Sequence, residues 1–272
     1  DAEQAIWLEY YGDRNGNRVP DPEEIGIHYF KGDGDFRSQE CIELLKEADI
    51  VVTNPPFSLF REYVAQLMKY EKKFVILGNQ NALHYKEIFP LVKENLIWIG
   101  YSSPKLFQIP DDFESNSVKV QDGIRYQQFG NIIWFTNLDI QKRHEELILY
   151  RKYNPNDYPK YENFDAIDVS AVSEIPSDYY GIMGVPDSFI EQFNPDQFEI
   201  IGIGSGDMAK QVGVKKNYRG RTDIALCING INKCPYSRIL IRRKQPTPVA
   251  YLSDNTVTMA AEDPEPYNQT SK

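Results

Sequence analysis

The sequence contains few cysteines and few histidines, and neither type is clustered. The cysteines are Cys41, Cys227 and Cys234, and the histidines are His28, His84 and His144. An odd number of cysteines without CxxC spacing indicates neither a disulfide framework nor a tetrahedral zinc site. An isolated histidine is usually a surface or packing residue. We therefore expect reduced thiols and no metal centre.

Long hydrophobic runs are also lacking. No stretch approaches the roughly 18 apolar residues that a membrane-spanning helix needs, and residues 1–4 carry neither a basic flank nor an apolar signal core. Hydrophobic residues still make up 41% of the 272 residues, which is enough for a sizeable core. These features predict a cytoplasmic globular protein with one large domain or two modest ones and no membrane partner.

Positive charge is scarce overall, since the formal net charge is -10, and this argues against a uniformly basic nucleic-acid coat. The balance reverses between Pro195 and Lys244, where ten basic residues face four acidic ones and the local net charge is +6. The basic residues of this segment are Lys210, Lys215, Lys216, Arg219, Arg221, Lys233, Arg238, Arg242, Arg243 and Lys244. Such a patch could neutralise phosphates and release their counterions. A solvated basic surface without a partner is the alternative.

Short apolar strands alternate with helical patterns in the first hundred residues. Strands are expected at 27–30, 49–53, 74–77 and 96–99, and helices after Ser38, at 59–72 and at 85–94. This alternation predicts an α/β fold with a doubly wound, mostly parallel sheet. Ligands of such sheets bind beyond the carboxyl ends of the strands.

The later part of the chain has a different character, and four segments are expected. They are a catalytic core at 1–140, an irregular Tyr- and Pro-rich region that wraps over the sheet at 141–194, a small β-rich basic module at 195–244, and a mobile tail at 245–272. Strands are expected at 124–126 and 132–135 in the core, and at 198–203, 224–228 and 237–241 in the module.

The strand at 49–53 ends on Asn54-Pro55-Pro56-Phe57, at the place where a reactive group would face the ligand crevice. Two successive prolines fix φ near -65° and remove two backbone donors, so that the carbonyls are rigid acceptors. The side-chain oxygen of Asn54 and the Pro55 carbonyl can converge on one amino group, and Phe57 can stack on an aromatic ring. A rigid strand-to-helix turn with Phe57 in the core is the structural alternative.

Together with other segments, this motif resembles a known family. "NPPF" after "ADIVVT" is similar to the catalytic motif of amino-group methyltransferases that use S-adenosylmethionine. The wider run "GDGDFRSQECIELLKEADIVVTNPPFSLFREYV", with "KKFVILGNQNALHYKEIFP", "WFTNLD", "YPKYENFDAI" and "GIMGVPDSF", resembles the EcoRI-type adenine-specific DNA methyltransferases. The resemblance covers about Tyr10 to Lys244 and implies a Rossmann-like core of the methyltransferase type.

The resemblance implies roles for individual residues. Asn54 and Pro55, with Pro56, would hold the amino group of an extruded adenine, and Phe57 would stack on its ring. Asp35 and Phe36 match the place where related enzymes contact the adenine moiety of the cofactor; a plain Gly-Asp turn is the alternative. A weaker candidate for the same crevice is Asn79, and Trp134 and Phe135 are weaker again because both are readily explained as core and turn residues.

The start of the chain departs from the family pattern. A strand with a glycine-containing cofactor loop, and a second strand ending in an acid, are expected before Asp33, and only Ala5–Tyr10 is a candidate for the second. We therefore expect that a natural N-terminal segment is absent. Gly202–Asp207 could be a permuted cofactor loop, but an isolated glycine loop is a weak signal and an ordinary hairpin connection is favoured.

The predicted function is transfer of a methyl group from S-adenosylmethionine to the N6 amine of a flipped adenine in duplex DNA. Lys215, Lys216, Arg219 and Arg221 are expected to touch phosphates or base edges. A cognate restriction endonuclease would be a functional partner. The alternatives are methylation of a protein glutamine amide or an RNA base amine, and a non-catalytic DNA-binding remnant.

Overall fold

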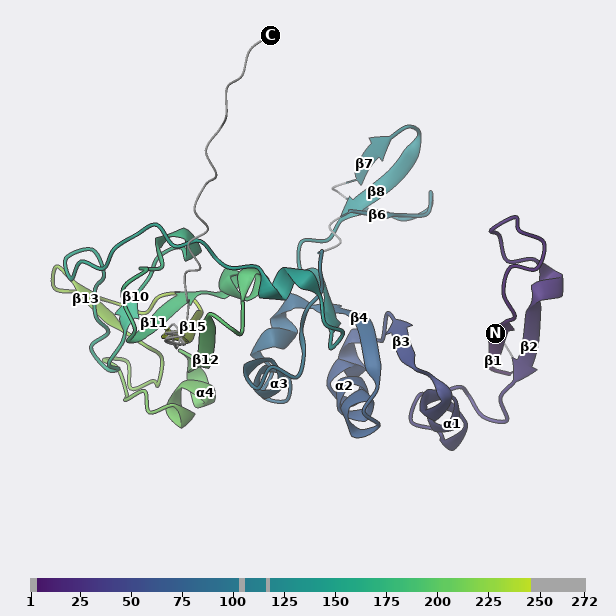
Figure 1. Cartoon of the computed structure of the whole chain (residues 1–272), viewed down its shortest axis with the longest axis horizontal. Coiled ribbons are helices and arrows are strands. Elements are labelled where there is room, and N and C mark those ends of the chain that lie inside the picture. Colours follow the sequence, from purple (N-terminus) through teal and green to yellow (C-terminus); the bar gives the residue numbers. More distant parts are fainter. Residues whose placement is uncertain (1–3, 103–105, 116–117, 246–272) are drawn as a thin grey trace, which may run out of the picture.

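The computed structural model describes residues 4–102, 106–115 and 118–245. The molecule is elongated, with the N-terminal hairpin at one end and a C-terminal module at the other (Figure 1). The expected mobile tail lies outside the described residues, apart from residue 245. Within the described residues, no helix is long and apolar enough to cross a membrane.

The N-terminal hairpin consists of β1 (Ile6–Tyr10) and β2 (Ile25–Tyr29), which pair antiparallel. Trp7 and His28 stack on it with ring centroids 4.0 Å apart. Helix α1 (Gln39–Glu47) follows and begins as expected, because the Ser38 hydroxyl caps it by accepting the Cys41 N–H.

The central sheet has the strand order β3-β4-β9-β5. Its strands are β3 (Ile50–Thr53), β4 (Lys73–Asn79), β9 (Ile132–Thr136) and β5 (Trp98–Ile99). Only β3 and β4 are parallel, joined by α2 (Phe60–Lys69), whereas β9 runs antiparallel to both of its neighbours. Helix α3 (Phe89–Lys93) lies between β4 and β5 along the chain.

Close packing of two rings against Gly78 fixes α2 on the central sheet. Phe60 and Phe135 are buried, and their ring centroids are 5.1 Å apart. A Cβ atom on Gly78 would lie 2.6 Å from one ring and 2.8 Å from the other, so only glycine fits this point of β4. This packing makes Phe135 a core residue, as the sequence analysis favoured over a role in the ligand crevice.

A three-stranded antiparallel sheet projects from the central sheet (Figure 1). It has the order β6-β8-β7 and consists of β6 (Leu106–Gln108), β8 (Ile124–Gln128) and β7 (Val118–Gln121).

The C-terminal module is a four-stranded sheet with the order β10-β11-β15-β12, joined by α4 (Gly206–Gln211). Its strands are β10 (Ile167–Asp168), β11 (Ile182–Pro186), β15 (Arg238–Arg243) and β12 (Phe198–Ile203). A separate hairpin, β13 (Leu226–Ile228) with β14 (Ile231–Lys233), extends from it. The sheet therefore draws strands from both the 141–194 and the 195–244 segments.

Buried polar groups and short helices complete the fold. The buried Asp168 carboxylate of β10 accepts bonds from Arg238 Nε at 2.9 Å and from the Tyr161 hydroxyl at 2.6 Å. Burial and the Asp168 charge raise the pKa of Tyr161. The 3₁₀ helices are η1 (Pro22–Glu24), η2 (Phe57–Leu59), η3 (Gln80–His84), η4 (Gln141–His144), η5 (Val172–Glu174) and η6 (Asp187–Gln192).

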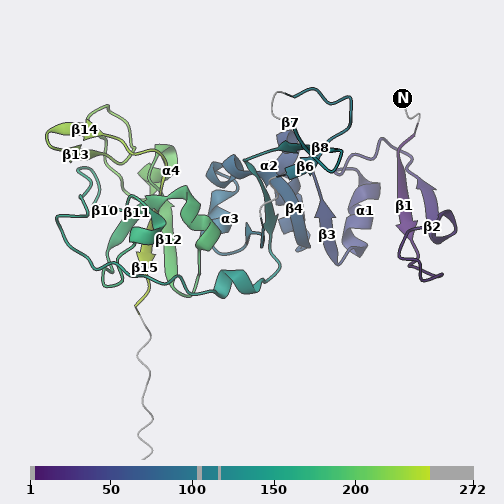
Figure 2. The same cartoon turned by 90° about the horizontal axis from the view of Figure 1, so that it is seen from above.

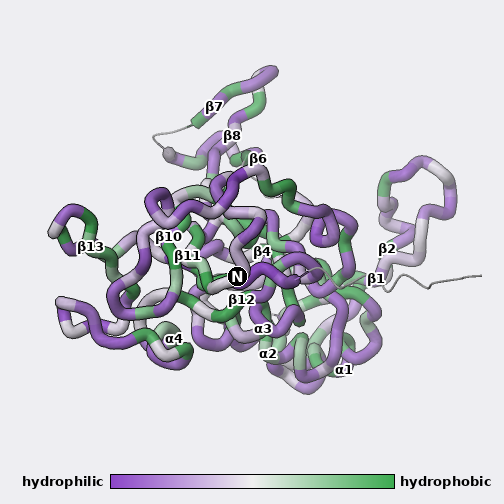
Figure 3. The backbone as a smooth tube through the Cα atoms, turned by 60° about the vertical axis from the view of Figure 1, so that its left-hand side comes forward, coloured by the Kyte–Doolittle hydropathy of each residue, from purple (hydrophilic) through white to green (hydrophobic). Residues whose placement is uncertain are grey.

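The main core is continuous from the central sheet to the C-terminal module. One cluster of buried side chains includes Phe74 and Ile76 of β4, Val185 of β11, and Ile200 of β12. Hydrophobic segments accordingly run through these strands, while the connecting loops are mostly hydrophilic (Figure 3).

The prediction of a doubly wound, mostly parallel sheet is wrong. The described residues form five small sheets, and only the pairs β3/β4 and β10/β11 are parallel. The alternation of strands and helices indicated the β3-α2-β4 unit correctly, but it carries no information on which strands become neighbours. In the structure β2 pairs with β1 instead of joining the central sheet, and β9 comes between β4 and β5.

Candidate active site

The Asn54-Pro55-Pro56-Phe57 corner lies directly after β3 and leads into η2 and α2. Pro55 is buried and anchors the corner, whereas Asn54 and Pro56 are exposed. The Phe57 ring is also accessible, with 39% of the residue exposed. The core position of this segment is instead taken by Phe60. The structural alternative, with Phe57 in the core, therefore does not describe the molecule.

The corner presents acceptors without competing donors. Among the described residues, none donates a hydrogen bond to the Asn54 side-chain oxygen or to the Pro55 carbonyl, while the Pro56 carbonyl accepts the Leu59 N–H at 2.9 Å. Neither proline has an N–H of its own. An amino group in front of the corner would therefore meet unused oxygen atoms.

Asn79 lies at the same edge of the central sheet as the corner. Thr53 is paired with Ile76 in the parallel β3/β4 ladder, so β4 continues three residues beyond the end of β3. The oxygen of the Asn79 side chain caps η3 by accepting the Asn81 N–H at 2.9 Å. Its amide nitrogen thus remains the group that can face a ligand at this edge.

Asp35 and Phe36 lie in the loop between β2 and α1, and contacts with α2 hold this loop. Phe36 packs edge-on against Tyr63 with ring centroids 5.0 Å apart, and the Phe36 carbonyl accepts from Gln66 Nε2 at 2.8 Å. Arg37 bonds Glu62 of the same helix at 3.1 Å. Because α2 follows the Asn-Pro-Pro-Phe corner, these contacts hold the Asp35 and Phe36 loop against the helix that comes directly after the predicted catalytic residues.

The Asp35 carboxylate is held by a bidentate bond from Arg37. The guanidinium donates to one oxygen at 2.9 Å and to the other at 2.7 Å, and the Arg37 N–H adds a third bond at 2.8 Å. These bonds lower the pKa of Asp35 to about 2. Asp35 is therefore an ionised acceptor with a fixed orientation. The sequence analysis did not predict the role of Arg37 in orienting Asp35, although Arg37 lies only two residues after Asp35.

The four predicted DNA-contacting cations, Lys215, Lys216, Arg219 and Arg221, lie exposed in one loop between α4 and β13. None of their side chains forms an ion pair with a described residue. We call residues 214–223 the basic loop. Its positive charge is available to a phosphate backbone.

Two asparagines that sequence reasoning missed hold the basic loop in shape. The buried Asn163 donates to the carbonyls of Lys215 and Asp223, both at 2.8 Å, and accepts the Ala225 N–H at 2.8 Å. The Asn217 side-chain oxygen accepts the N–H groups of Arg219 at 2.8 Å and of Arg221 at 3.2 Å. No local pattern signals such a brace, because the Asn163 partners are 52 to 62 residues away in sequence.

Gly202–Asp207 forms a strand-to-helix turn from β12 into α4, and the expected hairpin connection is therefore wrong. The Gly206 N–H donates to Asp223 Oδ1 at 3.0 Å, which ties this turn to the basic loop. A cavity of about 490 Å³ opens between the two segments and is lined by Lys210, Lys216 and Arg221, with Asp207 and Asp223. Three cations thus surround one concave surface.

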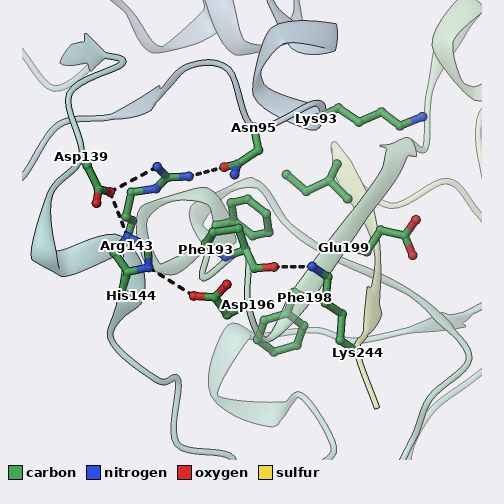
Figure 4. A pocket seen from close by; sticks show the side chains of 12 residues that line it. Lys93, Asn95, Asp139, Arg143, His144, Phe193, Asp196, Phe198, Glu199 and Lys244 are labelled. Atoms are coloured by element: carbon green, nitrogen blue, oxygen red, sulfur yellow. Dashed lines mark hydrogen bonds and ion pairs between the residues drawn. The ribbon is translucent and has the colours of Figure 1, made fainter. Parts of the chain in front are cut away.

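Another cavity, of about 370 Å³, is lined by residues of α3 and η4 and by residues of the C-terminal module (Figure 4). His144 bridges its wall, with Nε2 2.8 Å from Asp139 and Nδ1 3.1 Å from Asp196. Bonds to Asp139 and then to Asp196 raise the pKa of His144. None of the predicted catalytic or cofactor residues lines this cavity.

The described residues contain no group of three His, Cys, Asp or Glu side chains that could hold a metal ion. The three cysteines are free thiols.

The Asn-Pro-Pro-Phe corner is exposed at the end of a strand, and the loop that carries Asp35 is held against the helix that follows it. The same chain carries the braced basic loop. These features fit the class of nucleic-acid amino methyltransferases. The family model for the adenine-specific methyltransferase EcoRI matches residues 1–244. The chain belongs to this EcoRI-type family, which confirms the resemblance found in the sequence.

Three curated relatives are Type II methyltransferases. M.EcoRI of Escherichia coli is 46% identical over 252 residues, which cover 90% of this chain and 72% of the relative. M.MpnI of Mycoplasma pneumoniae is 40% identical over 235 residues, covering 83% of this chain and 73% of the relative. M.MgeORF184P of Mycoplasma genitalium is 38% identical over 226 residues, covering 79% and 71%. No solved structure matches the chain.

The predicted enzyme class is therefore confirmed. The chain is an adenine-specific DNA methyltransferase of the restriction-modification type, and it moves a methyl group from a donor to DNA. The family favours DNA over the protein and RNA substrates that the motif alone left open.

Proposed function

We propose that the chain methylates the N6 amine of an adenine that has rotated out of duplex DNA, at a specific sequence, with S-adenosylmethionine as the donor. The observation that carries this proposal is the state of Asn54: it is exposed, its side chain has no hydrogen-bonded partner among the described residues, and it lies between the end of β3 and a buried proline. A target inside the base stack cannot reach such a corner, so the base must leave the duplex at a cost of a few kcal/mol.

Asn54 and Pro55 orient the amine. Its lone pair is delocalised into the purine ring, and it becomes nucleophilic when its two hydrogens are held out of the ring plane. The Asn54 oxygen and the Pro55 carbonyl accept these two hydrogens, and the ring stacks on Phe57, a contact worth about 1 to 3 kcal/mol. Asn54 cannot take a proton as a carboxylate would, so the amine proton leaves to solvent after transfer. Catalysis then depends on position and electrostatics.

The cofactor residues of this proposal are Asp35, Phe36 and Asn79. S-adenosylmethionine supplies an electrophilic sulfonium methyl group when bound. The Asp35 carboxylate fits the amino group of the cofactor adenine because it is ionised and held by Arg37, and the Phe36 ring fits the flat face of the purine. The Asn79 amide nitrogen offers a donor at the same edge of the sheet.

The basic loop supplies the DNA contacts in this proposal. Lys215, Lys216, Arg219 and Arg221 form no ion pair with a described residue and lie on a braced backbone. We further propose that the enzyme works in the cytoplasm, where it protects DNA from a restriction endonuclease that recognises the same sequence.

Replacement of Asn54 tests the proposal. Asn54→Ala should abolish transfer of tritiated methyl from S-adenosylmethionine to duplex DNA and leave DNA affinity within a few fold. The matched control is Asn156→Ala, which removes another exposed amide and should keep full activity. Retained methyl transfer in Asn54→Ala would refute the role of the corner. Wild-type protein that methylates no adenine would refute the function itself.

A further inference from the structure

The β13–β14 hairpin stands apart from every larger sheet. Leu226 to Ile228 pair only with Ile231 to Lys233, and the two strands form a sheet of their own. The turn residues Asn229 and Gly230 have φ values of 53° and 78°, the left-handed pair that a tight two-residue hairpin requires. An isolated two-stranded hairpin is marginally stable in water, so its persistence needs support or a partner.

Two exposed isoleucines flank the turn of this hairpin. Residues 227–233 are all exposed, and Ile228 and Ile231, at 43% and 71% exposure, lie directly opposite each other beside the turn. Ile231 in particular buries little of its surface, so a polar residue at this position would cost the folded chain little. The pair is therefore suited to a contact outside the chain.

The base of the hairpin is fixed to the basic loop. Leu226 is buried, the Tyr218 hydroxyl donates to the Asn232 carbonyl at 3.4 Å, and Asn217 Nδ2 lies 3.3 Å from Cys234 Sγ. Since the Asn217 side chain also accepts the Arg219 and Arg221 N–H groups, hydrogen bonds connect the hairpin to the basic loop.

Charge favours a polyanion as the partner. The hairpin carries Lys233, and the basic loop at its base carries Lys215, Lys216, Arg219 and Arg221. The projecting β6–β8 sheet and the β13–β14 hairpin lie along the same side of the molecule (Figure 2). The carboxyl end of β4 faces this side too, because Asn79 pairs with Ile132, which follows β8 closely in the chain.

We propose that the β13–β14 hairpin enters the major groove of DNA, and that Ile231, with Ile228 beside it, contacts a thymine methyl group of the recognition sequence. The groove is wide enough for a two-stranded hairpin, and the thymine methyl is an apolar group that it presents. The basic loop would meanwhile hold the flanking phosphates. This inference rests on the proposed function, and it identifies residues that recognise the DNA sequence.

The test begins with the wild-type enzyme. Adenine methylation is mapped in cells that express it, which defines the recognised sequence. Binding to that duplex, to a scrambled duplex, and to duplexes with each thymine replaced in turn by deoxyuridine is then measured by fluorescence anisotropy. Wild-type binding should weaken about threefold or more at one replaced thymine, the loss of one buried methyl contact.

Ile231→Ser should bind the recognised sequence more weakly, approach its affinity for the scrambled duplex, and no longer respond to that thymine replacement. Ile148→Ser is the matched control, because Ile148 is 67% exposed and lies outside the hairpin; it should behave as the wild type. Equal unfolding temperatures confirm that both variants fold.

Two outcomes would overturn the inference. They are wild-type binding that no deoxyuridine replacement weakens, and an Ile231→Ser variant with unchanged discrimination. Each of these leaves methyl transfer intact and so leaves the proposed function standing. Absence of adenine methylation by the wild type would instead refute the proposed function, on which the inference depends.

Discussion

Asn163 and Lys215 bind each other twice through their amide groups. The Asn163 side chain donates to the Lys215 carbonyl at 2.8 Å, and the Lys215 N–H donates to the Asn163 carbonyl at 3.1 Å. A residue from the Tyr- and Pro-rich region thereby sets the position of the first cation of the basic loop. DNA binding should accordingly respond to a residue that has no charge and is only 7% exposed.

Asn163→Ala should lower stability by about 1 to 3 kcal/mol, because it leaves buried carbonyl and N–H groups without partners. It should also weaken DNA binding several fold, because the backbone of the basic loop loses its brace. Thermal unfolding and DNA titration measure the two effects. Asn156→Ala, on an exposed loop, should change neither. DNA affinity that stays at the wild-type value in Asn163→Ala would show that the brace does not position the loop.

Replacement of Arg219 and Arg221 together by alanine should weaken DNA binding and flatten its dependence on salt. Each lost phosphate contact lowers the slope of log K against log salt by about 0.9. The measurement is a DNA titration at several salt concentrations. The charge-preserving double change to lysine should keep most of the slope. If the alanine variant retains the wild-type slope, these two residues lie outside the interface.

Asp35→Ala should weaken S-adenosylmethionine binding about 10-fold or more, because a hydrogen bond to a charged group is stronger than one between neutral groups. Calorimetry measures the affinity, and Asp112→Ala is an exposed-carboxylate control. Since Arg37 lowers the pKa of Asp35 to about 2, Asp35 remains ionised between pH 5 and pH 9 and should add no pH dependence to the affinity there. Unchanged cofactor affinity in Asp35→Ala would remove this residue from the binding site.

His144 should make stability depend on pH near neutrality. The carboxylates of Asp139 and Asp196 raise its pKa above 6.5 in the folded state, so the protonated form is stabilised by folding. This stabilisation is complete below pH 6.5, the pKa of the unfolded chain, and it is lost as the pH rises through the higher folded-state pKa.

The difference in unfolding temperature between the wild type and His144→Gln should therefore be largest at low pH and shrink above neutrality. Scans at several pH values, on the wild type and the variant in parallel, provide the measurement. If the difference in unfolding temperature stays constant across the pH range, the ion pairs of His144 with Asp139 and Asp196 make no pH-dependent contribution to stability.

Local patterns predicted the elements of the fold better than their arrangement. The Ser38 cap and the strand at 198–203 appear as expected, because capping and apolar runs are local properties. Strand pairing is not local: β9 is inserted next to β4 although 52 residues separate the end of β4 from the start of β9.

The candidate site shows the same contrast. Asn54, Phe57 and the four cations were predicted from the sequence and are exposed in the structure. Arg37 and Asn163 were not predicted, because their importance lies in bonds that only the folded chain creates.

The double-proline corner also reduces the conformational entropy that is lost when a base binds. Two pyrrolidine rings restrict the backbone by covalent bonds, so its shape does not depend on tight packing by neighbouring segments. Little conformational freedom then remains to be lost when a base arrives. A site of this kind can stand open to water and still keep its geometry, without a lid that must close over it.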